Sequence, residues 1–198
     1  MSAHRRDEYL QAALLAIEPG RVQIQLDLTA GISVADAVLS QIDTDRTGTI
    51  SSAETLAYGN SVLNEVSLEA DGEPLHLELR NQYVPAIESV RKGEGAVRLE
   101  LSARMPSLGP GPHTLRYRNR HRADISVYLA NVLVPVSDRV AVAAQRRDVD
   151  QRELTVDFVL RPQPASKSGY WLTIAVAGML IALTALWYRR GTMKSSAQ

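Results

Sequence analysis

Short runs in which apolar and polar residues alternate fill most of the first 160 residues, and this alternation constrains the fold more than any other feature. A period of two places every second side chain on one face of a β-strand. Frequent turn residues separate the runs, which is typical of two packed antiparallel sheets. We therefore expect a mainly β domain over residues 4–161, with an immunoglobulin-like β-sandwich fold. The runs begin at Val22, Val66, Leu75, Val97, Leu115, Ile125, Val140 and Leu154.

Turn residues indicate how some of these runs are joined. Asp71-Gly72 lies between the runs that begin at Val66 and Leu75, and predicts that the two pair as a hairpin. The segment 8–17 is ambiguous. Its composition suits a helix, whereas Pro19-Gly20 ahead of the next run favours a hairpin instead.

One stretch interrupts the alternation. Residues 43–54 read DTDRTGTISSAE, which fits a single EF-hand calcium-binding loop with glycine at the sixth position, where the backbone turns sharply. Calcium takes six to eight oxygen ligands, and the loop offers carboxylates, hydroxyls and a carbonyl in the expected order. The predicted calcium ligands are Asp43, Asp45, Thr47, the carbonyl of Thr49, Ser51 through a water, and Glu54.

The composition of this loop also predicts its strength and its place in the fold. Only three of the ligands are carboxylates, since the fifth position is threonine, so we expect a dissociation constant on the order of 10⁻⁴ to 10⁻³ M. Residues 32–42 and 52–65 are expected to form the two flanking helices. The hand would then be an insertion, at about 32–65, in an otherwise β domain.

A second departure lies near the C-terminus. Residues 170–188 read YWLTIAVAGMLIALTALWY, which is 19 residues without a charge and has an aromatic pair at each end. A helix of this length spans roughly 28 Å, enough to cross the hydrocarbon core of a bilayer. Aromatic rings are enriched at both membrane interfaces. We therefore expect a transmembrane helix over 170–188, after a linker over 162–169. A buried core helix and a cleaved sorting tail are the alternatives.

Flanking charge predicts the orientation of this segment. Arg189, Arg190 and Lys194 follow it, so the positive-inside rule places the tail 189–198 in the cytoplasm and the large domain outside, in the periplasm. Such an orientation requires an export signal, and the stretch before His4 has no apolar run. A signal peptide removed before Met1 would explain this. A tail-anchored protein with a cytosolic domain is the alternative.

Composition and the remaining polar residues narrow the function. The formal net charge is zero, which gives no bulk attraction to nucleic acid, and the chain has no cysteine. Of the four histidines, only His4 stands out, as a nickel or copper ligand at a processed N-terminus. Four arginines recur at every second position, which suits a solvated sheet face, ion pairing or an anion patch. They are Arg116, Arg118, Arg120 and Arg122.

Three segments carry a resemblance to a known family. They read HRRDEYLQ from His4, YRNRHRADISVYL from Tyr117 and QRRDVDQREL from Gln145. Over about residues 4–160, the chain resembles the extracytoplasmic domain of HupE/UreJ-like membrane proteins. Those proteins are described as nickel or cobalt permease-like, and their domain often carries a similar Asp-rich loop after a signal peptide. This chain has one predicted span, so transport by it alone is not expected.

Two functions follow from these observations. The first is a membrane-anchored, extracytoplasmic calcium-binding domain with a structural or interaction role. The second is an accessory domain for nickel, cobalt or copper handling, beside a separate transporter as membrane-protein partner. We expect no enzymatic activity, since no nucleophile elbow, phosphate loop or dinucleotide fingerprint is present. A calcium-dependent hydrolase is the least favoured alternative.

Overall fold

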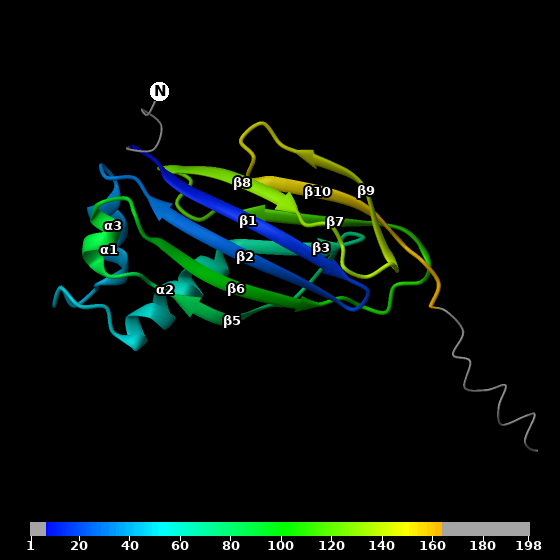
Figure 1. Ribbon diagram of the computed structural model, residues 1–198, viewed down its shortest axis with the longest axis horizontal. Helices are drawn as coiled ribbons and strands as arrows, with labels where there is room; N and C mark the ends of the chain where they lie inside the picture. Colours follow the sequence, from blue (N-terminus) through cyan, green and yellow to red (C-terminus); the bar gives the residue numbers. More distant parts are fainter. Residues whose placement is uncertain (1–6, 164–198) are drawn as a thin grey trace, which may run out of the picture. The chain divides into compact units, whose positions relative to one another are not determined.

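The computed structural model describes residues 7–163, and these form two five-stranded sheets with few helices (Figure 1). The predicted mainly β fold is confirmed, and the two sheets are consistent with a β-sandwich. The compact unit they belong to ends at Pro162. The strands are β1 Tyr9–Glu18, β2 Arg21–Ala30, β3 Val66–Ala70, β4 Glu73–Pro74, β5 Leu77–Tyr83, β6 Ala96–Arg104, β7 Gly111–Asn119, β8 Ser126–Val132, β9 Val140–Arg147 and β10 Glu153–Leu160.

One sheet has the strand order β5-β6-β2-β1-β8 and the other β4-β3-β7-β10-β9. All neighbouring strands are antiparallel except β1 and β8, which run parallel. The alternating residues of both sheets bury their apolar side chains in one common core. Tyr117 and Phe158 are among its largest members, and helical residues join it.

The N-terminal segment forms a hairpin. Glu18 pairs with Arg21 across Pro19-Gly20, and the register continues to Tyr9 opposite Ala30. The hairpin alternative for residues 8–17 is therefore correct and the helical one is wrong. Every second residue of β1 is buried, so the segment follows the period of a strand rather than that of a helix.

The hairpin predicted at Asp71-Gly72 is only partly correct. Both residues have positive φ, 51° and 87°, as a type I′ turn requires. However, β4 pairs with β3 over only two residue pairs, and β5 begins at Leu77 in the opposite sheet. Apolar alternation looks the same for strands of either sheet because both inner faces meet in one core. It therefore does not reveal where a chain crosses between sheets.

Three helices lie at one end of the strands: α1 Ala35–Ile42, α2 Ser52–Asn64 and α3 Ile87–Arg91 (Figure 1). The strand β7 runs from the opposite end of the domain to the end where the helices lie. Its last residue, Asn119, pairs with Val66, and the next backbone N–H, of Arg120, bonds to Glu65 just after α2. Its first residue, Gly111, pairs with Leu160 at the end of β10. The helices and the end of β10 therefore lie at opposite ends of β7.

Candidate metal centre

The predicted helix-loop-helix forms between β2 and β3. The helices α1 and α2 correspond to the predicted segments 32–42 and 52–65, with α1 starting three residues later. Their inner faces belong to the common core: Val38 and Ile42 of α1, and Tyr58 and Val62 of α2, are buried. The helix-loop-helix is therefore an integral part of the domain rather than an appended module.

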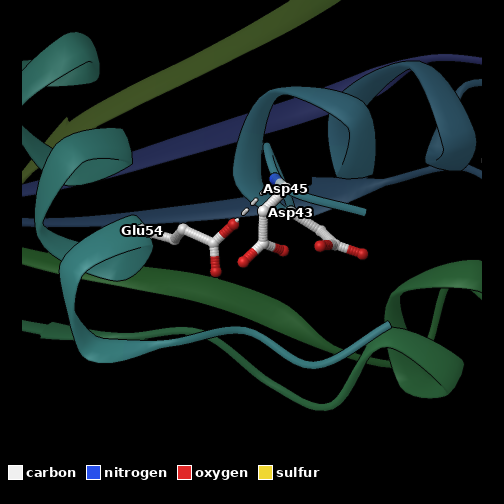
Figure 2. A group of neighbouring side chains, drawn as sticks. All are labelled: Asp43, Asp45 and Glu54. Atoms are coloured by element: carbon white, nitrogen blue, oxygen red, sulfur yellow. Dashed lines mark hydrogen bonds between the residues drawn. The ribbon is translucent and has the colours of Figure 1, made fainter. Parts of the chain in front are cut away.

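The loop between the helices brings three carboxylates together. Asp43 follows the last residue of α1, Asp45 lies two residues on, and Glu54 stands in the first turn of α2 and reaches back toward them (Figure 2). Carboxylate oxygens of the three residues lie within 4.8 Å of one another. In residues 7–163, this is the one group of three or more acidic, histidine or cysteine side chains close enough to hold a metal ion.

Backbone N–H groups fix the two aspartates. The Thr47 N–H donates to both Asp43 Oδ1 and Asp45 Oδ1 at 3.0 Å, and the Gly48 N–H donates to Asp43 Oδ2 at 3.0 Å. Gly48 has a φ of 78°, so glycine is the natural residue at this sharp bend. The loop therefore folds back around its own first side chain.

Glu54 is the most constrained of the three carboxylates, with only 8% of the residue exposed. Its Oε2 accepts from the Ser51 N–H (2.9 Å) and hydroxyl (2.8 Å), and its Oε1 accepts from the Thr44 N–H (2.8 Å). The Ser51 hydroxyl in turn accepts from the Glu54 N–H, completing a capping box at the start of α2. These bonds, those to Ser51 foremost, lower the pKa of Glu54 to about 2. The side chain is therefore charged at neutral pH.

The other predicted ligands lie in the same loop. The Thr47 hydroxyl donates to the Thr49 carbonyl at 3.1 Å, so these two oxygens are adjacent. The Ser51 hydroxyl is occupied by its cap, which suits a ligand that acts through water. Each carboxylate oxygen of Asp43 and Asp45 accepts at most one hydrogen bond and keeps a lone pair for a cation. Both oxygens of Glu54 already accept two or more hydrogen bonds.

The loop also contacts the core through one apolar residue, and the sequence pattern did not predict this contact. Ile50, the eighth loop position, is half-buried against the common core. In the predicted single EF-hand, this position would have no second loop to pair with. The Ile50 side chain packs against the core instead. An apolar side chain in an otherwise polar loop was the sequence signal that could have predicted this contact.

Histidines do not gather with the acidic cluster. His121 is buried near α2, and the His113 imidazole bonds to Asp71 at 2.7 Å at another site. His4 and the predicted span 170–188 lie outside the described residues. Within residues 7–163, no helix is both long and apolar enough to cross a membrane.

A buried polar network joins the hand to the sheets, and sequence reasoning missed it. The hydroxyls of Tyr9 and Tyr58 lie 2.6 Å apart, and that of Tyr58 lies 3.3 Å from His121 Nε2. Gln11 and Tyr128 both donate to the His121 carbonyl, at 2.6 and 2.8 Å. Two of the segments that carry the family resemblance therefore meet here, those around residues 4–11 and 117–129.

The arginines at every second position do not share one face. Arg116 and Arg118 lie on β7 and both pair with Glu153 of the neighbouring β10. Beyond the strand, Arg122 has a φ of 49° and binds Asp124 through two nitrogens at 3.0 Å. Of the expected alternatives, ion pairing is the one that these contacts support, within the sheet for Arg116 and Arg118 and within a turn for Arg122.

No protein-family model, curated protein or solved structure matches the chain. The resemblance to HupE/UreJ-like extracytoplasmic domains therefore stays a prediction.

Proposed function

We propose that this chain is a membrane-anchored, extracytoplasmic calcium-binding domain with a structural or interaction role. The observation that supports it best is the convergence of Asp43, Asp45 and Glu54 from the two sides of one loop. Bringing three carboxylates within 4.8 Å is electrostatically unfavourable unless a cation shares the site. The loop pattern of residues 43–54 contains the same three carboxylates at its first, third and twelfth positions.

The donor set fits calcium better than a transition metal. All the candidate ligands are hard oxygens, from carboxylates, the Thr47 hydroxyl and the Thr49 carbonyl. Nickel, cobalt and copper favour imidazole, and no imidazole belongs to the cluster. A bound calcium ion would neutralise the carboxylates and restrain the loop, while Gly48 keeps its backbone turn.

We also propose that the fold is immunoglobulin-like, with β8 and β9 as additional edge strands. Without these two, one sheet contains the first, second, sixth and fifth strands, and the other contains the fourth, third, seventh and tenth. This arrangement resembles the A-B-E-D and C′-C-F-G order of such sandwiches. On this assignment, the hand occupies the connection between the second and third strands.

Replacing Glu54 by glutamine should abolish calcium binding, because it removes the charge of the residue that closes the loop. Glutamine is tolerated at the third position of a capping box, so α2 should still form. Isothermal titration calorimetry on the full chain in detergent should show one weak site in the wild type and none in the variant. Glu65→Gln, the same change at the other end of α2, is the matched control. Unaltered calcium binding by Glu54→Gln would refute the assignment.

Calcium should order the loop and leave the strands unchanged. Hydrogen exchange with and without a chelator should show added protection at residues 43–54, where backbone N–H groups surround the carboxylates. The helices α1 and α2 are held by the core, so their inner turns should change little. If chelation reduces protection in β6 and β10 as well, calcium is required for the whole fold.

The anchor and its orientation are tested separately. In right-side-out membrane vesicles, added protease should reach the large domain and leave a fragment that includes 170–188 in the membrane. Complete protection until the vesicles are lysed would instead support a tail-anchored protein with a cytosolic domain.

A further inference from the structure

The connection between β8 and β9 exposes an apolar tip. Val134 and Val136 are almost fully exposed, and Leu133 is nearly half exposed, with Pro135 between the valines. In the described part of the chain, the one other valine exposed to this degree is Val149, in the turn between β9 and β10. Apolar side chains presented together in this way usually mark a contact with a partner or a membrane.

This tip is attached to the point where the chain leaves the domain. The Arg161 N–H donates to the Arg139 carbonyl at 2.8 Å, and the Arg161 guanidinium donates to the Asp138 carbonyl at 2.7 Å. Leu160, just before Arg161, pairs with Val140, just after Arg139. Figure 1 shows the start of β9 and the end of β10 at the same end of the sheet. The tip therefore lies beside the exit of the chain.

The length of chain beyond this exit limits its distance from a bilayer. Eight residues, 162–169, separate the domain from the uncharged run 170–188. Fully extended, they reach at most roughly 28 Å. If 170–188 spans the bilayer, the exit end of the domain stays close to the lipid surface, and the apolar tip with it.

We propose that Leu133, Val134 and Val136 insert into the interfacial region of the phospholipid bilayer that anchors the chain. This inference rests on the proposed membrane anchor. Valine and leucine gain free energy by leaving water for the acyl boundary. Arg139 and Arg161 at the base of the tip suit contact with phosphate headgroups, and Asp138 lowers the local excess of positive charge. The domain would then be held to the surface at two points.

The absence of cysteine from the chain makes a clean experiment available. Val136→Cys carries a nitroxide label in the full chain, reconstituted as single copies in nanodiscs of phosphatidylcholine and phosphatidylglycerol. Val149→Cys is the matched control, because it is an equally exposed valine at the other end of the β9–β10 hairpin. The measured quantities are two collision rates of the nitroxide. One is with oxygen, which concentrates in lipid, and the other is with a water-soluble nickel complex.

The expected oxygen-to-nickel collision ratio at residue 136 is roughly threefold that at residue 149, as for side chains buried ~5–10 Å into the headgroup boundary. Val134→Cys should behave like Val136→Cys. Equal ratios at 136 and 149, in a chain that resists alkaline extraction from membranes, would overturn the insertion and leave the anchor intact. Low collision with both reagents at 136 would indicate a protein contact and would also overturn it. Release of the chain by alkaline extraction would refute the anchor and the insertion together.

Discussion

Replacing Ile42 by alanine should lower the free energy of unfolding of the whole domain by about 3 kcal/mol, within the usual range for such truncations. Ile42 is the last residue of α1, directly before Asp43, and its side chain is fully buried in the common core. The substitution leaves a cavity in the common core to which residues of both sheets belong. Urea unfolding of the full chain in detergent should show this lower free energy of unfolding. The spectroscopic signals of the helices and of the strands should change together in a single transition.

A truncation at an exposed helical position separates the cost of the core cavity from any change in helix propensity. Leu56→Ala changes an exposed leucine in α2, the other helix of the hand, and should cost well under 1 kcal/mol. If Ile42→Ala changes calcium binding but leaves the unfolding transition where it was, the hand folds as an independent insertion and its integration into the core is wrong.

Protonation of His121 should lower the free energy of unfolding of the domain by about 2 kcal/mol as the pH falls from 6.5 to 4.5. Burial, followed by the positive charge of Arg122, lowers the pKa of His121 to about 4, although Asp124 opposes the shift. An unfolded histidine titrates near 6.5. Because the folded pKa is the lower one, the contribution is complete above 6.5 and is lost as the pH falls toward 4. Only 5% of His121 is exposed, so solvent screens the effect little.

The control is the variant His121→Gln, which keeps a polar group opposite Tyr58 but does not titrate. The slope of unfolding free energy against pH is compared between this variant and the wild type. Glutamine will alter the stability at neutral pH, and that offset does not affect the comparison. His113 acts in the opposite direction: burial lowers its pKa, but bonds to Asp71 and the Gly109 carbonyl outweigh this and raise it. Both proteins retain His113, so the difference between the slopes reports His121 alone. Identical slopes would contradict a buried neutral imidazole.

Sequence periodicity predicted the strands well but not their partners. The alternation from Val97 to Ala103 or from Leu154 to Leu160 states which side chains are buried, and the structure agrees. It does not state which sheet a strand joins. The parallel pairing of β1 with β8 joins residues more than 100 positions apart. The crossing at Leu77 depends on pairing with β6, which follows it in the chain. The helix α3 has five residues, too few for a helical period to show.

The candidate site was more predictable than the strand pairing because its residues lie close together in the sequence. The loop pattern placed Asp43, Asp45 and Glu54 together before any distance was known. The same pattern contains a second signal, since Ser51 and Glu54 stand three apart and form the capping box. By contrast, the buried network of Gln11, Asn119 and His121 is assembled from distant segments. Each of these polar residues reads as exposed when considered alone.

The candidate loop 43–54 and the chain exit lie at opposite ends of β7, and this bears on the cation concentration that the loop meets. Nine residues of β7 extend over roughly 27 Å, at about 3.3 Å for each step. Anionic headgroups enrich divalent cations only within about a Debye length, roughly 8 Å at physiological ionic strength. In a chain anchored through 170–188 with β7 along the membrane normal, the loop would lie beyond that layer. Calcium binding there would then follow the calcium concentration of the surrounding medium and would be insensitive to the lipid composition of the membrane.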